Sequence, residues 1–272
     1  MIAHYLTNHK IIMTTEKTST TKHTTLKEEA KSLLFVVLIA IMIRTLIIEP
    51  FFIPSGSMRD TLREGDYVFA TKYNYGYSKF SFLFITPEFI KGRMLESKPE
   101  RGDIVIFKLP NKMEKRFIKR LIGLPGDKIQ MVSGILYIND KAIEREYLGK
   151  ITNENGNEYK RYLEVLPNGA KYYAQYAVSQ THRGLADNTQ VFNVPEGQYF
   201  FIGDNRNESN DSRIDLGFVP FENFIAKAQF IFFSAKEWLW IDNAGVSEQI
   251  AQVSKWLGSM RWSRFFKSVY SL

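Results

Sequence analysis

The sequence contains no cysteine and only four histidines. Without cysteine there can be no disulfide, no thiol nucleophile and no thiolate metal site. Three histidines, His4, His9 and His23, lie in the first thirty residues, and the fourth is His182 in a polar stretch. A Ser–His–Asp triad and a multi-histidine metal cluster are therefore nearly excluded.

Long apolar runs are also scarce, and the mean hydropathy of −0.22 is too low for a protein with many membrane spans. Residues 33–43 are eleven apolar residues without a break. Extended to Ile48 the run is long enough to cross a bilayer, because an arginine near a helix end can reach the interface. We therefore predict an uncleaved transmembrane anchor over residues 32–49. A cleaved signal peptide or a buried core helix is the alternative, but no small-x-small site follows the run.

Residues 1–31 are polar and predict a cytoplasmic tail. Five lysines against three glutamates favour a cytoplasmic N-terminus under the positive-inside rule. Met13 is a second possible start. Everything after residue 50 would then lie outside the inner membrane. A protein there encounters little nucleic acid, so we do not expect a nucleic-acid partner despite the net charge of +7.

From residue 51 onward the pattern is one of short strands. Runs rich in β-branched or aromatic residues, bounded by Gly, Asn, Asp and Pro, occur at 66–71, 103–108, 117–122, 134–138, 199–202 and 228–233. Such a pattern is typical of an antiparallel β domain. We predict a mainly β fold with its main domain at 50–138 and 199–235, and a smaller inserted β domain at 139–198.

Two aromatic segments predict contact with the bilayer interface. Residues 73–89 contain seven aromatic side chains, and the tail 236–272 carries basic and aromatic residues with a helical apolar spacing from Ile250 to Met260. Aromatic and basic residues together suit a membrane surface. The alternatives are a loop packed on the core and an ordinary terminal helix.

Two short patterns could carry chemistry. In Ser55-Gly56-Ser57 a serine could attack a carbonyl while the neighbouring hydroxyl and an amide stabilise the oxyanion, although Ser-Gly-Ser is usually a loop. With histidine nearly excluded, Lys119 is the candidate base. In a strand it shares a face with Phe117 and Leu121, and burial there would lower its pKa; the alternative is a lysine that reaches water.

A third segment, 203–213, is dense in hydrogen-bonding residues just after an apolar strand. It could hold a second hydroxyl against the lysine amine, or be a solvated hairpin. A calcium loop is disfavoured because the EF-hand spacing is missing.

Taken together and in order, these blocks resemble bacterial type I signal peptidases. The resemblance rests on the anchor followed by the blocks 50–58, 101–107, 118–127 and 203–213. It implies a mostly antiparallel β fold with a catalytic domain and a smaller inserted domain. It also implies a serine endopeptidase at the inner membrane, with its catalytic domain on the periplasmic face and no metal or organic cofactor. The partners would be the bilayer and preproteins cleaved after Ala-x-Ala.

The resemblance also assigns roles to residues. Ser57 matches the nucleophile, Lys119 the general base, Ser55 the oxyanion-hole hydroxyl, and Ser209 the serine that orients the lysine amine. An ion pair of Asp211 and Arg213 would support the site, with Arg120 nearby. The walls of shallow pockets for small substrate residues match Ile53, Pro54, Met58, Leu62, Phe117 and Ile118.

The sequence departs from the family pattern at Asn207-Glu208, where many relatives have Asp-Asn, and at 214–217. The insertion of about 60 residues is also short for the family. Three other functions remain open: a self-cleaving Ser–Lys repressor-type protease, a penicillin-binding acyltransferase, and a silent membrane-anchored module that binds secretory precursors. A repressor-type protease would need a DNA-binding domain in the place where this sequence predicts the membrane anchor. A penicillin-binding acyltransferase needs an S-x-x-K motif, and the only match, Ser19 to Lys22, lies in the polar tail.

Overall fold

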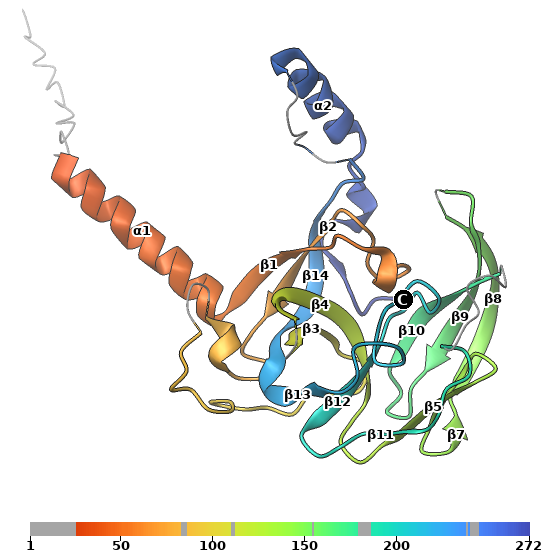
Figure 1. The fold of residues 1–272 in the computed structure, drawn as a ribbon. Helices are drawn as coiled ribbons and strands as arrows, with labels where there is room; N and C mark the ends of the chain where they lie inside the picture. The colour runs from red at the N-terminus through yellow and green to blue at the C-terminus, as the bar shows by residue number, and fades with distance from the viewer. Residues whose placement is uncertain are drawn as a thin grey trace, which may run out of the picture. The chain divides into compact units, whose positions relative to one another are not determined.

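The computed structural model describes residues 26–82, 86–109, 112–153, 155–178, 186–237, 239 and 245–272 (Figure 1). Most of the predicted polar tail, with Met13, lies outside these residues, as do Phe84 and His182. The chain divides into two compact units, Met1–Ala40 and Ile41–Leu272. The strands and the candidate site all belong to the second unit.

The apolar run forms part of α1 (Leu26–Leu46). The helix begins earlier than the predicted anchor and ends earlier too, because β1 (Ile48–Phe52) follows at once and carries Pro50, which cannot continue a helix. The side chains of Leu33 to Leu38 are exposed. Within the described part of the chain, no helix has the length and apolarity that a membrane crossing requires.

The largest sheet has eight strands in the order β1-β2-β14-β3-β4-β12-β13, with β15 paired to β14. Its other strands are β2 (Asp66–Thr71), β3 (Ile104–Leu109), β4 (Lys112–Gly123), β12 (Gln198–Ile202), β13 (Val219–Pro220), β14 (Phe224–Ser234) and β15 (Lys267–Ser268). Every pair of strands in it is antiparallel. The prediction of a mainly antiparallel β fold is therefore confirmed, and the run 66–71 matches β2 in full.

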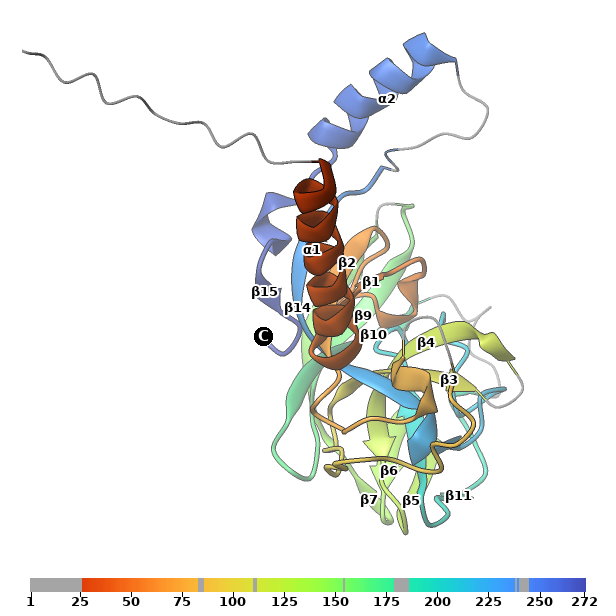
Figure 2. The same cartoon turned by 90° about the vertical axis from the view of Figure 1, so that its left-hand side faces the viewer.

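Two smaller sheets follow, and both are antiparallel (Figure 2). The three-stranded sheet has the order β10-β9-β8, and the four-stranded sheet has the order β11-β5-β6-β7. Their strands are β5 (Lys128–Val132), β6 (Ile135–Ile138), β7 (Lys141–Ala142), β8 (Glu144–Thr152), β9 (Glu158–Val165), β10 (Lys171–Ala177) and β11 (Phe192–Asn193). The predicted insertion, 139–198, begins after β6. In the structure, β5 and β6 already belong to the four-stranded sheet with β7 and β11, and not to the large sheet.

One hydrophobic core joins all three sheets. Ile122 on β4 and Phe200 on β12 pack with Leu136 on β6 and Tyr172 on β10, and each is almost completely buried. Complete burial of an aliphatic or aromatic side chain of this size stabilises a fold by about 1.5–3 kcal/mol. The small sheets are thereby fixed to β4 and β12, the two strands that lead into the candidate site.

The two aromatic segments are only partly exposed. In the first, Tyr75 and Phe80 are buried, whereas Phe89 is 85% exposed. The second contains α2 (Val246–Gly258), whose apolar residues Ile250, Val253 and Leu257 are exposed. After α2 the chain returns to the core, where Arg264 is buried and donates a hydrogen bond to the Asp66 carboxylate. Contact of the exposed part with a membrane stays a prediction.

Candidate active site

Ser57 lies in a single 3-10 turn, η1 (Gly56–Met58), directly after β1. Ser55 precedes the turn in an extended conformation, and the Arg59 amide closes the turn by donating to the Gly56 carbonyl at 2.9 Å. The ion-paired ends of Glu64 and Arg59 lie against Gly56, where a Cβ would come within 2.5 Å of Glu64 Oε1. Ser57 itself is only 6% exposed.

Lys119 approaches Ser57 from β4. It lies opposite Val105 in the pairing of β3 with β4 and is 4% exposed. Its Nζ lies 2.7 Å from Ser57 Oγ and donates to the Ile118 carbonyl at 3.0 Å. A serine hydroxyl and a buried amine are thus in direct hydrogen-bond contact, the distance at which a proton can pass between nucleophile and base.

Burial lowers the pKa of Lys119 from its ordinary value to about 8, because desolvation disfavours the ammonium. The negative charges of Asp211 and Asp204 oppose this shift. A substantial fraction of the amine is therefore neutral slightly above neutral pH, and a neutral amine can accept the Ser57 proton.

The loop after β12 holds the turn that carries Ser57 from the other side. The Asn205 amide donates to the Ser57 carbonyl at 3.1 Å, and the Asn205 side chain donates to the Gly56 carbonyl at 3.1 Å. Gly203 allows this close approach, since a Cβ there would lie 2.2 Å from Ser209 Oγ and 2.5 Å from the Ser57 carbonyl oxygen.

Asp211 and Arg213 form a fully buried ion pair at 2.8 Å inside this loop. Asp211 also accepts the Gly203 amide at 2.9 Å, so the pair anchors the start of the loop. Burial alone would raise the pKa of Asp211, but Arg213 holds it below its usual range. The carboxylate therefore stays charged.

Arg120 makes a separate ion pair that the sequence did not reveal. It donates to both Asp204 oxygens at 2.7 Å, and Thr61 donates to the same carboxylate at 2.6 Å. A Gly-Asp-Asn turn signal gave no reason to expect Asp204 as a buried partner. Arg120 thus joins β4 to the start of the loop rather than contacting the Asp211–Arg213 pair.

Ser209 and Ser55 are less engaged than the resemblance implies. Ser209 is buried beside Gly203, and its side chain helps to hold the pKa of Asp211 below its usual range, but no hydrogen bond joins it to Lys119 in the described part of the chain. Ser55 is exposed, and its hydroxyl does not cap the turn. The roles of both hydroxyls stay predictions.

The six predicted pocket residues do not form one group. Ile53, Met58 and Leu62 are almost completely buried in one hydrophobic cluster, against which Ile118 packs. Phe117 lies in a different cluster with Phe107, and Pro54 is exposed. Their roles as pocket walls stay predictions.

A second buried network connects the loop to the three-stranded sheet, and the sequence did not reveal it either. Arg206 pairs with Glu164 of β9, and both are almost completely buried. The hydroxyls of Tyr172 and Tyr176 on β10 each donate to Glu164 at 2.7 Å and accept from Arg206. Burial alone would raise the pKa of Glu164, but Arg206 and the two hydroxyls hold it below its usual value.

The departure at Asn207-Glu208 has a structural counterpart here. Asn207 accepts the Ala177 amide at 2.7 Å, and Glu208 accepts from the Asn205 side chain at 2.9 Å and from the Tyr159 hydroxyl. Both residues therefore tie the loop to the small sheet and to Asn205.

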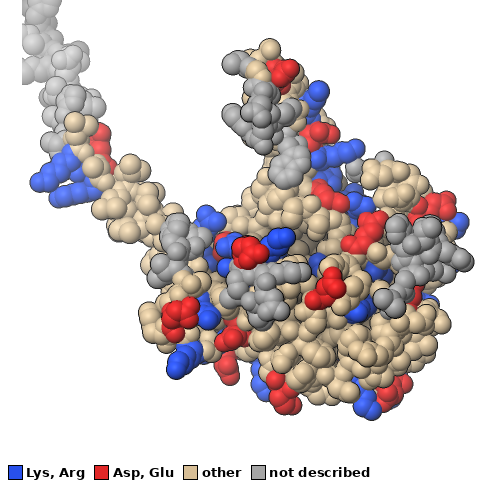
Figure 3. Space-filling model, in the orientation of Figure 1, with Lys and Arg blue, Asp and Glu red and all other residues tan. Residues whose placement is uncertain are grey.

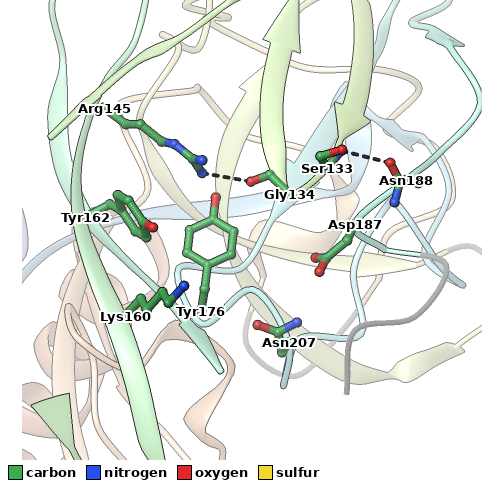
Figure 4. A pocket seen from close by; sticks show the side chains of 9 residues that line it. All are labelled: Ser133, Gly134, Arg145, Lys160, Tyr162, Tyr176, Asp187, Asn188 and Asn207. Atoms are coloured by element: carbon green, nitrogen blue, oxygen red, sulfur yellow. Dashed lines mark hydrogen bonds between the residues drawn. The ribbon is translucent and has the colours of Figure 1, made fainter. Parts of the chain in front are cut away.

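Two pockets lie near these networks. One of about 440 Å³ is lined by Arg145, Lys160, Tyr176 and Asp187 among others (Figure 4). The other, of about 330 Å³, begins at Arg59, directly after η1. Acidic and basic side chains are interspersed over the face shown in Figure 3. Among the described residues, no group of three or more His, Asp and Glu is placed to hold a metal ion.

Comparison with known proteins gives one consistent family. Residues 26–233 match the model of the family described as signal peptidase, peptidase S26. The signal peptidase I of Rickettsia canadensis (strain McKiel) is 53% identical over 94% of this chain and 97% of its own length. That of Rickettsia prowazekii (strain Madrid E) is 52% identical over 91% and 96%. The crystal structure of a signal peptidase I from Enterococcus faecalis V583 is 29% identical and covers 48% of this chain and 97% of its own, with a TM-score of 0.28.

Proposed function

We propose, since the chain belongs to the signal peptidase family, peptidase S26, that it removes signal peptides from preproteins with Ser57 as nucleophile and Lys119 as general base. The observation that carries the proposal is the 2.7 Å contact between Ser57 Oγ and the buried Lys119 Nζ. The pKa of Lys119, lowered by burial to about 8, supports the role of base because the neutral amine is the reactive form.

The reaction follows from this pair. The Lys119 amine takes the Ser57 proton while Oγ attacks the carbonyl of the last signal-peptide residue. The oxyanion is stabilised by the Ser57 amide and the Ser55 hydroxyl, and one such donor is typically worth about 2.7–4 kcal/mol in rate. The Lys119 ammonium then protonates the leaving amine, which frees the mature protein and leaves an ester on Ser57. A water that Lys119 deprotonates hydrolyses the ester.

The loop 203–213 would keep the two partners in register. Asn205 bonds the backbone of the nucleophile turn, and Arg120 joins β4 to the loop through Asp204. We assign Asp211 and Arg213 to anchoring the loop and Ser209 to orienting the amine once substrate is bound. Selection of small residues, as in Ala-x-Ala, is assigned to shallow pockets around Ile53, Pro54, Met58, Leu62, Phe117 and Ile118.

We also propose attachment to the inner membrane, with the catalytic domain on the periplasmic face. The exposed apolar side chains from Leu33 to Leu38, and those of Ile250, Val253 and Leu257 on α2, support it. Co-flotation of the full chain with phospholipid vesicles tests attachment, and a chain that stays entirely with the soluble fraction would contradict it.

The reaction is tested with a purified preprotein whose signal ends in Ala-x-Ala. The full-length wild type in detergent and lipid should release a mature protein whose N-terminus follows the second alanine. Ser57→Ala should lose essentially all of this activity while keeping the same melting temperature within a few degrees. Equal cleavage by both proteins would show that Ser57 is not the nucleophile, and a folded wild type that binds but never cleaves would favour the silent binding module.

A further inference from the structure

Asn205, in the loop after β12, bonds both peptide groups that flank Ser57. Its backbone amide donates to the Ser57 carbonyl at 3.1 Å, and its side-chain Nδ2 donates to the Gly56 carbonyl at 3.1 Å. The second bond concerns the proposed reaction, because the Gly56 carbonyl and the Ser57 amide belong to one peptide group. This group is trans and planar, so its C=O and N–H point in opposite directions. Whatever fixes the Gly56 carbonyl therefore also fixes the direction of the Ser57 amide.

The direction of this amide matters because the proposed reaction relies on it to stabilise the oxyanion. A hydrogen bond weakens steeply when the angle at the donor falls below about 120°. The Gly56 carbonyl also accepts the Arg59 amide at 2.9 Å, and bonds accepted at the C=O of a peptide group polarise its N–H. Support of the Gly56 carbonyl thus affects both the direction and the strength of the donor.

Glu208 determines which end of the Asn205 side chain faces the turn. Asn205 Nδ2 donates to Glu208 Oε2 at 2.9 Å as well as to the Gly56 carbonyl. Asn205 is completely buried, and its Oδ1 accepts no hydrogen bond from the described residues. A reversed side-chain amide would place Oδ1 against a carboxylate and a carbonyl, neither of which can donate. The Glu208 carboxylate therefore keeps Nδ2 directed at the Gly56 carbonyl.

Glu208 is held in turn by a residue of the small three-stranded sheet. The hydroxyl of Tyr159 on β9 donates to Glu208 Oε1, and burial together with this carboxylate raises the pKa of Tyr159 to about 12. The hydroxyl therefore remains a donor over the pH range of an enzyme assay. Glu208 Oε2 also lies 3.9 Å from Arg59 Nη1, so an effect of charge on that arginine is the alternative to exclude.

We propose that Glu208 is a positioning residue for the oxyanion: through Asn205 and the Gly56 carbonyl it directs the Ser57 amide at the developing negative charge. The inference rests on the proposed function. It gives a role in the reaction to one of the two residues, Asn207-Glu208, at which this sequence departs from the family pattern. It also connects β9 to the chemical step.

The test compares Glu208→Leu, which removes both acceptor oxygens, with Glu208→Gln, which keeps one oxygen for Asn205 but no charge. Loss of a whole oxyanion donor costs about 100–1,000-fold in kcat, so a donor that is present but poorly directed should cost about tenfold. We expect this loss for Glu208→Leu at unchanged KM, because only the transition state uses the bond. Glu208→Gln and the control Glu146→Leu, an exposed site on β8, should keep the wild-type kcat. Equal losses in Glu208→Leu and Glu208→Gln would assign the effect to charge and overturn the proposal.

Two further measurements separate the direction of the amide from a general loosening of the site. A peptide aldehyde ending in Ala-x-Ala forms a hemiacetal: Ser57 Oγ bonds to the aldehyde carbon, and the serine proton passes to the former carbonyl oxygen, which takes the oxyanion position. Its inhibition constant should rise about tenfold in Glu208→Leu, as for a mimic of the transition state. The pH profile should keep the apparent pKa of about 8 for Lys119, whereas water entering a loosened site would raise it. An unchanged inhibition constant or a raised apparent pKa would overturn the proposal.

Tyr159→Phe provides an independent variant that leaves Glu208 and Asn205 in place. The Glu208 side chain is 36% exposed, and melting temperatures check that each variant is folded. Because both side chains act through one amide, Tyr159→Phe should lower kcat less than Glu208→Leu and should add no further loss to it, whereas additive losses would overturn the connection to β9. A folded wild type that neither cleaves the preprotein nor binds the aldehyde would contradict the proposed function itself. A wild type that does both, beside an equally active Glu208→Leu, would overturn this inference alone.

Discussion

At the scale of single residues, the candidate site is closely packed around Gly203. It contacts both Ser209 and the Ser57 carbonyl, and there is no space for a Cβ on that side. Its φ is not positive, so what requires glycine here is close approach and not backbone conformation. The turn that carries Ser57 and the loop can meet only because this residue has no side chain.

Gly203→Ala should therefore lower kcat of preprotein cleavage by at least about 100-fold, because a displacement of about 1 Å at a reacting group can cost that much. Gly217→Ala is the matched control, since a Cβ there would meet nothing within 4 Å although its φ of 60° carries some strain. Steady-state kinetics with the same preprotein measures both. A Gly203→Ala enzyme with wild-type kcat would show that the close packing is not needed.

At the scale of elements, strands were predictable and their partners were not. Residues 66–70 alternate in burial within β2, and the run 66–71 is recognisable from β-branched and aromatic residues alone. The run 134–138 was equally recognisable, but nothing in it shows that β6 pairs with β5 and β7 rather than with the large sheet. Pairing depends on which strands share a core, and in this chain one core crosses all three sheets.

Some residues of the candidate site could likewise be predicted from the sequence, and others could not. Ser57 and Lys119 could be proposed from residue type, strand periodicity and the family resemblance, and the structure brings them into contact. Asp204, Glu164 and Arg206 could not be proposed from the sequence. Charged residues in a polar stretch are expected to face solvent, and they are buried only together with a partner of opposite charge. Local sequence does not show which distant charge that partner is.

The Glu164–Arg206 pair gives a prediction at this scale. Glu164→Gln leaves Arg206 buried without a counter-charge, and breaking a buried pair in this way costs about 3–5 kcal/mol. Glu158→Gln, on the same strand, breaks an exposed pair with Lys150 at 3.3 Å and should cost at most about 1 kcal/mol. Chemical denaturation measures both free energies of unfolding, and equal losses would contradict the view that this pair fixes the loop to the small sheet.

At the scale of the whole second unit, the site forms where three separate parts of the chain converge. The turn after β1 supplies Ser57, β4 supplies Lys119, and the loop after β12 bonds the turn. Residues of the small sheets pack on β4 and β12 and pair with Arg206. The inserted strands therefore support the loop after β12, and β5 and β6, which precede residue 139, share their sheet with β7 and β11.

The most direct test of the proposed mechanism is the pH dependence of acylation. The rate of ester formation on Ser57 is measured under single-turnover conditions from pH 5.5 to 10, with rapid quenching and intact-protein mass spectrometry. Because the neutral amine is the base and burial lowers the pKa of Lys119 to about 8, the rate should rise about tenfold per pH unit at low pH and level off above about 8. A rate that is flat across this range, with chemistry limiting, would contradict a lysine base at Lys119.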